Sequence, residues 1–222
     1  MSAAVQTGVV FGAAPFEVGP RLRARLASLE DAVLVAADGG AAAALELGLV
    51  PGLVLGDFDS IEPDRLEALR ARGIPVQPYP RDKDVTDGEL AVQHVLGMLA
   101  PGAEVLLIGF LGGPRLDHEL ANVLLLVRLP SGCALVDERT EVRLLRHGQR
   151  YEWVPEAGEL VTLLALDSVA DGVSTRGLKW QLDAATLEVG STRGVSNEAL
   201  GDPAAVEVGR GLLLVVRHFG AR

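Results

Sequence analysis

The sequence predicts an α/β protein in which a mostly parallel α/β sandwich domain is followed by a C-terminal antiparallel β-sandwich domain. Up to about residue 138, short apolar runs alternate with segments of helical pattern, which is typical of a parallel sheet covered on both faces. From about residue 141, short apolar or alternating runs are separated by glycines and show no helical period, which is typical of antiparallel strands. We therefore expect two domains, residues 1–138 and 139–222.

Strands and helices are expected in turn along the first domain. The expected strands and extended segments are 5–12, 32–40, 53–57, 74–80, 103–110 and 133–137. The expected helices are 20–29, 41–48, 62–72, 86–99 and 116–129. The ends of these helices carry ordinary signals: Pro63 lies in a first turn and Gly73 follows a last turn, and Thr86 with Glu89 forms a capping-box pattern.

The second domain is expected to contain strands only. Its apolar or alternating runs are “EVRLLRHGQRYEWV”, “GELVTLLAL”, “GVSTRGLKWQL”, “TLEVG” and “GLLLVVRHF”. Glycines and turn residues separate these runs, as they do in sandwiches and open barrels.

The composition is that of a globular protein without nucleic-acid-binding character. Of the 222 residues, 49% are hydrophobic and 23% are charged, which are ordinary values. The formal net charge is −10 and no block of Lys or Arg stands out, so we expect no nucleic-acid partner. An acidic protein that handles phosphates needs local cations or a metal ion to do so.

The sequence also favours a cytoplasmic location. The N-terminus lacks the basic region and the long apolar stretch of a signal peptide, and no uninterrupted apolar run is long enough for a membrane span. Cys133 is the single cysteine, which excludes an internal disulfide and fits a reducing compartment.

The stretch “VLGDFDSI”, residues 54–61, ends a predicted strand in two carboxylates. Residues two apart on a strand point to the same side, so Asp57 and Asp59 are expected to face together while Phe58 points into the core. Two adjacent carboxylates repel, and Mg²⁺ would remove that conflict. The alternative is a solvated loop in which the aspartates simply turn the chain.

Further polar residues occupy the loop “RDKDVTDGELA”, residues 81–91. Asp82, Asp84 and Asp87 lie at a strand-to-helix junction, and Asp87 is in the first helical turn, where a carboxylate is favoured by the helix dipole. Lys83 is a candidate phosphate contact, with a simple counter-charge as the alternative.

Two other loops offer candidate ligand contacts. “ADGG”, residues 37–40, places Asp38 beside Gly39 and Gly40, which would let a ligand approach the backbone; an ordinary turn is the alternative. “GGPRLDHELAN”, residues 112–122, opens a helix whose N–H groups can receive an anion. Its candidate side chains are Arg115 for phosphate, Asp117, His118 and Asn122, although a lone histidine in this position is more often a surface residue.

The ordered set of motifs resembles the thiamine pyrophosphokinase family. The matching segments are “ADGGA”, “LGDFDSI”, “KDVTDGELA”, “GGPRLDHELAN”, “GLKWQL” and “GSTRGVSN”. The resemblance implies an α/β domain followed by a β-domain, and transfer of a pyrophosphoryl group from ATP to the hydroxyl of thiamine, which gives thiamine diphosphate and AMP. It also implies a homodimer with active sites shared between the subunits.

The resemblance also implies roles for individual residues. Asp57, Asp59 and Asp87 would hold Mg²⁺ and serve catalysis, and Asp84 would support them. Asp117 would also serve catalysis, near phosphate and thiamine. The residues expected at ATP and its phosphates are Asp38, Gly39, Lys83, Arg115 and His118. The residues expected at thiamine are Trp180, Ser196 and Asn197.

One departure and two alternatives accompany this reading. The family commonly has Gly-Gly-Arg, whereas here Pro114 stands between Gly113 and Arg115, so the reach of Arg115 is expected to differ. A metal-dependent phosphatase or nucleotidyl-sugar enzyme could also use the “DFD” segment, and a non-catalytic thiamine or nucleotide sensor could keep the fold. The retention of every acidic motif favours the pyrophosphokinase.

Overall fold

The computed structural model describes residues 7–29, 31–59, 61, 63–201 and 203–220. The chain forms two compact units. The N-terminal unit comprises the described residues up to Leu125 together with Gly132–Glu138, and the C-terminal unit comprises Leu126–Ser131 and the described residues from Arg139 onward.

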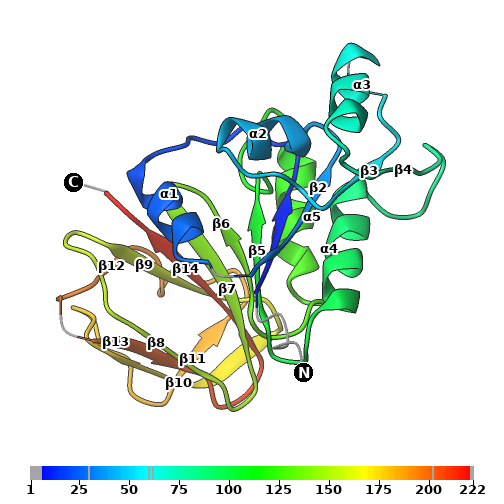
Figure 1. The fold of residues 1–222 in the computed structure, drawn as a ribbon. Coiled ribbons are helices and arrows are strands. Elements are labelled where there is room, and N and C mark those ends of the chain that lie inside the picture. The colour runs from blue at the N-terminus through cyan, green and yellow to red at the C-terminus, as the bar shows by residue number, and fades with distance from the viewer. Residues whose placement is uncertain (1–6, 30, 60, 62, 202, 221–222) are drawn as a thin grey trace. The chain divides into compact units, whose positions relative to one another are not determined.

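The N-terminal unit contains a parallel sheet with the strand order β6-β5-β1-β2-β3-β4 (Figure 1). The strands are β1 Thr7–Phe11, β2 Val33–Ala37, β3 Leu53–Gly56, β4 Val76–Pro78, β5 Glu104–Ile108 and β6 Cys133–Val136. Each neighbouring pair is parallel. The order of the strands along the chain reverses between β1 and β5, and such a reversal point is where open α/β sheets bind ligands.

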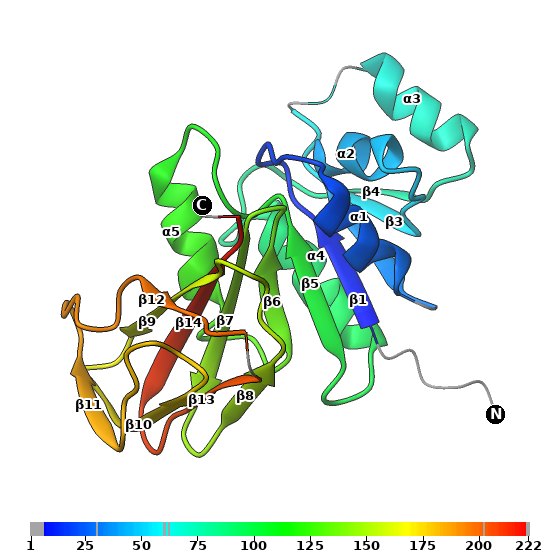
Figure 2. The same ribbon diagram turned by 90° about the vertical axis from the view of Figure 1, so that its left-hand side faces the viewer.

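Helices cover both faces of this sheet, as Figure 2 shows for α1 and α2 on one side and α4 on the other. The helices are α1 Pro20–Ala27, α2 Gly40–Glu46, α3 Pro63–Ala71, α4 Asp87–Met98 and α5 Leu116–Leu125. Successive residues of β1 face the helices on opposite sides of the sheet. Val9 belongs to the apolar cluster that includes residues of α1 and α2, whereas the neighbouring Gly8 lies against Val95 of α4. The parallel α/β domain expected from the sequence is confirmed.

The last turn expected for α5 is absent. We expected helix to residue 129, but α5 ends at Leu125. The guanidinium of Arg146 donates to the carbonyl oxygens of Leu126, Val127 and Leu129, at 2.8, 3.1 and 2.6 Å. These carbonyl groups are therefore drawn toward a side chain that is distant in sequence, which replaces the last helical hydrogen bonds.

The C-terminal unit is an antiparallel β-sandwich, as expected. Its strands are β7 Thr140–Arg146, β8 Arg150–Trp153, β9 Leu160–Ala165, β10 Val169–Arg176, β11 Ala185–Glu188, β12 Asn197–Glu198, β13 Ala204–Glu207 and β14 Leu212–His218. One layer has the order β12-β9-β14-β7 and the other the order β11-β10-β13-β8. The two layers share one core, because Leu163 and Val215 of the first lie in the same cluster as Val173 and Val206 of the second.

None of the helices in the described part of the chain is long and apolar enough to cross a membrane.

Candidate functional site

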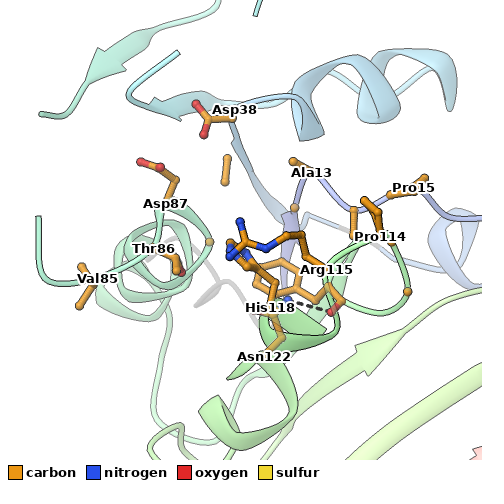
Figure 3. Close-up of a pocket in the computed structure, with 18 of the residues that line it drawn as sticks. Ala13, Pro15, Asp38, Val85, Thr86, Asp87, Pro114, Arg115, His118 and Asn122 are labelled. Carbon is orange, nitrogen blue, oxygen red and sulfur yellow. Dashed lines mark hydrogen bonds between the residues drawn. The ribbon is translucent and has the colours of Figure 1, made fainter. Parts of the chain in front are cut away.

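A cavity of about 430 Å³ opens at the C-terminal ends of the strands of the N-terminal unit (Figure 3). Its walls come from the loops after β1, β2 and β5 and from the starts of α4 and α5. The loops after β1 and β5 touch through glycines, because a Cβ at Gly12 would lie only 2.5 Å from the carbonyl oxygen of Gly109. The cavity therefore lies at the reversal point of the sheet, where backbone groups line its floor.

Three carboxylates gather at the edge of this cavity. Oxygen atoms of Asp38, Asp57 and Asp87 all lie within 4.8 Å of one another. Asp38 follows β2, Asp57 follows β3 and Asp87 begins α4. All three are half-buried, so their charges repel in a partly desolvated place.

Asp38 shows the strongest effect of this crowding. Burial, followed by the charge of Asp87, raises the pKa of Asp38 to about 6. Its Oδ1 atom accepts a hydrogen bond of 3.1 Å from the backbone N–H of Phe58. The sequence predicted that Asp38 contacts a phosphate. In the structure, Asp38 is one of the three clustered aspartates.

Lys83 is the cation beside these carboxylates. Its ammonium lies 3.1 Å from Asp87 and 3.6 Å from Asp57, and it donates to the carbonyl oxygen of Pro80. Burial alone would lower the pKa of Lys83, but the hydrogen bond and the charge of Asp87 outweigh burial and raise it. Lys83 is therefore charged and already occupies part of the space between the acidic groups.

One oxygen atom of the cluster has no partner. Asp87 Oδ1 is buried and accepts no hydrogen bond in the described part of the structure. Buried carboxylate oxygens are normally hydrogen-bonded or coordinate a metal. Half-buried carboxylate oxygens, one of them without a hydrogen-bond partner in the described residues, are ligands that suit a hard divalent cation such as Mg²⁺.

Asp59 does not lie where strand geometry predicted. β3 ends at Gly56, and Phe58 has a φ of +58°, so the alternation of a strand does not reach Asp59. Asp59 instead donates its backbone N–H to Asp57 Oδ1 at 3.2 Å and pairs at 3.6 Å with exposed Arg81. The expectation that Asp57 and Asp59 face together as strand residues is wrong, whereas the expected packing of Phe58 against the core is confirmed.

The close approach of β2 and β3 at this point depends on Gly56. Its φ is +151°, and a Cβ there would collide with the carboxylate of Asp38. Only glycine leaves room for that carboxylate beside β3.

The loop before α5 closes another wall of the cavity. Pro114, Arg115 and His118 line it. Arg115 holds Asp117 with two parallel hydrogen bonds, the Nε bond being 2.9 Å long, and the pKa of Asp117 falls to about 2, chiefly because of this bond. Both side chains are largely exposed, so Arg115 can turn to another anion.

The remaining loop residues have simpler surroundings. Asn122 donates to the carbonyl oxygen of Phe110 at 2.8 Å, which ties α5 to the end of β5. Thr86 caps α4 by accepting from Glu89 N–H at 3.2 Å, as the capping-box pattern predicted. Asp84 is exposed, and Gly39 caps α2.

The C-terminal unit brings Trp180, Ser196 and Asn197 into one neighbourhood. Trp180 is 55% exposed, and the ammonium of Lys179 lies 4.7 Å from the centroid of its ring. Ser196 has a φ of +59°, and its N–H donates to the hydroxyl of Thr162 at 3.0 Å.

Asn197 is buried, and its side-chain amide forms hydrogen bonds with backbone groups. Its Oδ1 atom accepts from Trp180 N–H at 3.0 Å and from Glu198 N–H at 2.9 Å. Its Nδ2 atom donates to the Trp180 carbonyl at 2.6 Å. The family resemblance implied that Asn197 contacts thiamine, and no sequence motif signals the hydrogen bonds between its amide and the backbone of Trp180 and Glu198.

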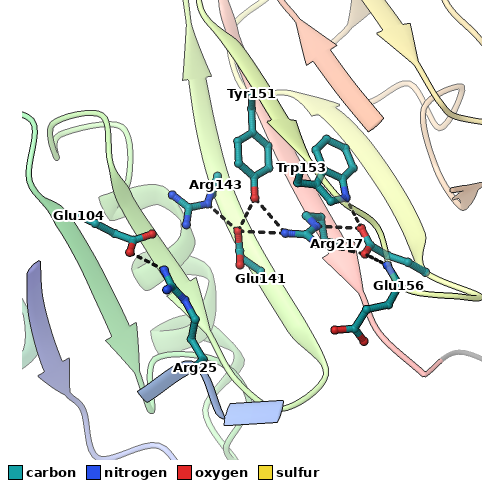
Figure 4. Close-up of polar contacts among 9 residues, drawn as sticks. Arg25, Glu104, Glu141, Arg143, Tyr151, Trp153, Glu156 and Arg217 are labelled. Carbon is teal, nitrogen blue, oxygen red and sulfur yellow. Dashed lines mark hydrogen bonds and ion pairs between the residues drawn. The ribbon is translucent and has the colours of Figure 1, made fainter. Parts of the chain in front are cut away.

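A buried polar network stabilises the same unit (Figure 4). Arg217 binds Glu159 through Nε and Nη2, at 2.8 and 3.0 Å, and Trp153 donates to the same carboxylate at 2.8 Å. Glu141 accepts from Tyr151 at 2.8 Å. Burial raises the pKa of Glu141, but the nearby arginines outweigh burial and hold it below its usual range.

Comparison with known families gives two matches along the chain. The model described as “Thiamin pyrophosphokinase, catalytic domain” matches residues 26–136. The model described as “Thiamin pyrophosphokinase, vitamin B1 binding domain” matches residues 149–213.

Similar proteins agree with these matches. A thiamine pyrophosphokinase of Bacillus subtilis is 24% identical over 191 residues, covering 85% of this chain and 88% of the relative. Thiamine pyrophosphokinase 1 of Oryza sativa subsp. japonica is 30% identical over 156 residues, covering 66% of this chain and 58% of the relative.

Solved structures share the fold. The crystal structure of the Bacillus subtilis protein has a TM-score of 0.83 at 22% identity, covering 96% of this chain and 98% of that one. That of a thiamin pyrophosphokinase from Geobacillus thermodenitrificans has a TM-score of 0.82 at 26% identity, covering 97% and 98%.

Proposed function

The chain belongs to the thiamin pyrophosphokinase family, and we propose that it carries out its transferase reaction at the carboxylate cluster described above. The hydroxyl oxygen of thiamine attacks the β-phosphorus of ATP, the bond between that phosphorus and the α,β-bridging oxygen breaks, and AMP leaves. The hydroxyl proton is released in the same reaction. The observation that carries this placement is the group of Asp38, Asp57 and Asp87, of which Asp38 and Asp87 line a ligand-sized cavity.

We propose that Asp38, Asp57 and Asp87 hold Mg²⁺, with the orphaned Asp87 Oδ1 among the ligand atoms. When bound, Mg²⁺ acts as a Lewis acid that stabilises charge on the phosphate oxygens. Asp59 supports the site from outside this group, through its contacts with Asp57 and Arg81.

Cationic side chains would position the triphosphate. Lys83 lies among the carboxylates, and Arg115 and His118 line the same cavity. Pyrophosphoryl transfer depends mainly on alignment and charge neutralisation, which these groups supply. The candidates for accepting the hydroxyl proton are Asp84, Asp87 and Asp117. Gly39 is proposed as a backbone contact to the nucleotide.

We assign thiamine binding to the C-terminal domain, residues 139–222, and catalysis to residues 1–138. Trp180 presents an exposed aromatic ring that can stack on the thiazolium cation. Ser196, which precedes Asn197, has a left-handed backbone with a φ of +59°. Asn197 acts by holding Trp180 in place.

We further propose a homodimer in which the C-terminal domain of one subunit completes the site of the other. Leu116, Leu120 and Leu124 are 67%, 54% and 55% exposed and lie four residues apart, so they form one apolar face of α5 beside Arg115. Exposed apolar faces of this kind are typical of protein interfaces. A cytoplasmic location is also proposed, in keeping with the free, buried Cys133.

The direct test is incubation with thiamine, ATP and Mg²⁺, followed by separation of the products. We expect AMP and thiamine diphosphate in equal amounts. Formation of ADP and thiamine monophosphate would contradict pyrophosphoryl transfer, and the absence of any thiamine-dependent product would favour the non-catalytic sensor.

A further inference from the structure

Arg81 lines the cavity beside the carboxylate cluster, and its surroundings differ from those of the other cationic side chains there. Lys83 is only 13% exposed and lies 3.1 Å from Asp87, and Arg115 forms two parallel hydrogen bonds with Asp117. The side chain of Arg81 is 80% exposed and donates no hydrogen bond to any residue in the described part of the chain. Of these three cations, Arg81 is therefore the one held least tightly by the protein.

The charged partner of Arg81 is a carboxylate next to the aspartate cluster. Its Nε atom lies 3.6 Å from Asp59 Oδ2, which is longer than a hydrogen bond. Asp59 is itself 48% exposed, and its N–H donates to Asp57 Oδ1 at 3.2 Å. Exposed ion pairs contribute little to stability, so Arg81 can exchange Asp59 for another anion at small cost without leaving the edge of the cluster.

The backbone that carries Arg81 is fixed, although its side chain is exposed. Before it, the N–H of Tyr79 donates to the carbonyl oxygen of Gly56, the last residue of β3, at 2.8 Å. The ammonium of Lys83 also donates to the carbonyl oxygen of Pro80 at 3.1 Å. These contacts join the loop to the strand that leads into the carboxylate cluster, so the guanidinium group starts from a defined place.

The charges at this edge of the cavity are suited to a phosphate only if a cation balances them. Phosphate oxygens that approach the carboxylate cluster also approach the negative charge of Asp59, which repels them. A guanidinium group neutralises such oxygens and can donate two parallel hydrogen bonds to them. Arg81 is the side chain that pairs with Asp59, and it can supply both the charge and the hydrogen bonds.

We propose that Arg81 binds the polyphosphate of ATP, exchanging its contact with Asp59 for phosphate oxygens when the nucleotide enters the cavity. This inference rests on the proposed function, because it takes ATP as the substrate. Thiamine is excluded as the partner of Arg81, since its positive thiazolium would be repelled. Arg81 lies two residues before the segment “KDVTDGELA”, so the motifs that carry the family resemblance do not include it.

The test measures tripolyphosphate binding to Arg81→Gln, with Arg70→Gln as the matched control. Each substitution removes one positive charge from an exposed arginine of the N-terminal unit, so the net charge changes equally. Arg70 lies in the last turn of α3 and does not line the cavity. Binding is measured by calorimetry at saturating Mg²⁺, and circular dichroism and the Tm of each variant establish that it is folded.

We expect Arg81→Gln to weaken tripolyphosphate binding by roughly tenfold or more, as for the loss of a charge-assisted contact. Arg70→Gln should bind tripolyphosphate as the wild type does. Arg81→Lys keeps the charge but loses the planar fork, so its affinity should lie between those of the wild type and Arg81→Gln. Equal affinities for Arg81→Gln and Arg70→Gln would overturn the proposal.

Binding of Mg²⁺ alone distinguishes a phosphate contact from an effect transmitted through Asp59. Because Arg81→Gln removes a positive charge beside the carboxylates, it should bind Mg²⁺ at least as tightly as the wild type. Weaker Mg²⁺ binding would show that Arg81 acts by holding Asp59 and would overturn the proposal. A higher thiamine KM with normal tripolyphosphate binding would overturn it as well.

These binding measurements need no turnover. A wild type that binds tripolyphosphate but forms no AMP would refute the proposed reaction and leave the test of Arg81 as a polyphosphate contact intact. Normal AMP formation together with unaltered tripolyphosphate binding in Arg81→Gln would overturn the role of Arg81 alone.

Discussion

The side-chain amide of Asn197 is hydrogen-bonded to both backbone groups of Trp180, accepting from its N–H at 3.0 Å and donating to its carbonyl at 2.6 Å. This pair of bonds fixes the peptide from which the exposed indole projects. Because each hydrogen bond contributes about 0.5–1.5 kcal/mol and buried partners left unmade cost more, Asn197 holds the backbone of Trp180 in place.

Asn197→Ala should therefore raise the KM for thiamine while leaving the KM for ATP close to that of the wild type. It should also lower stability by about 2 kcal/mol. Steady-state kinetics and denaturant unfolding measure the two effects. Gln181→Ala, which changes an exposed neighbour, is the control; equal thiamine KM values in both variants would show that Asn197 does not act through Trp180.

Asp57→Asn and Asp87→Asn should each reduce kcat by about a hundredfold or more, because loss of a metal ligand removes about 3 kcal/mol of transition-state stabilisation. Asp64→Asn changes an exposed aspartate in the first turn of α3 and should be nearly neutral. Initial rates are measured across a range of Mg²⁺ concentrations. Turnover close to normal at limiting Mg²⁺ in both cluster variants would exclude them as ligands.

Lys83→Gln should lower kcat on the order of a hundredfold, the usual effect of removing one preorganised charge contact. The thiamine KM should change little, because Lys83 contacts Asp57 and Asp87. Stopped-time assays at saturating ATP measure the effect. A variant with unchanged kcat and a higher thiamine KM would instead connect Lys83 with thiamine.

Mixed dimers test whether sites are shared between subunits. The Asp57→Asn and Trp180→Ala variants are each first shown to be severely impaired, and are then mixed under conditions that would exchange the subunits of the proposed homodimer. A shared site assembles one intact copy from the unmutated halves, so activity should return. Heterodimers that form, by native mass spectrometry, without regaining activity would assign each site to a single chain.

Glu141 predicts how stability depends on pH. Its folded-state pKa lies below the ordinary value of 4.5, so its stabilising contribution is complete above pH 4.5 and is lost as the pH falls through the lower folded value. Glu141→Gln should cost about 3 kcal/mol at pH 7, as expected for breaking a buried charge network, and should flatten the acid limb. Unfolding free energies from pH 3 to 7 measure this effect.

Glu152→Gln serves as the comparison for this experiment, because Glu152 pairs with Arg150 at the surface. An acid limb of the same steepness in wild type and Glu141→Gln would remove Glu141 as its cause.

The fold followed from local patterns, whereas the site depended on contacts between distant segments. Apolar runs and the cap at Thr86 are local signals. Asp38 joins Asp57 because β2 and β3 are neighbours, which no single motif shows. Asp59 lies outside the carboxylate cluster because Phe58 adopts a left-handed conformation, which strand alternation does not predict. The early end of α5 depends on Arg146, a residue distant in sequence.

Gly56 has a consequence for how this sequence can vary. Its backbone requires a positive φ, and any side chain there would occupy the place of the Asp38 carboxylate. The two positions are therefore not independent: among all single substitutions in a growth selection for thiamine diphosphate synthesis, position 56 should be as intolerant as position 38, although it carries no functional group. A double variant with a shorter side chain at position 38 would remove the collision with a side chain at position 56. It would not remove the need for a positive φ at position 56, so paired substitutions at the two positions should also be poorly tolerated.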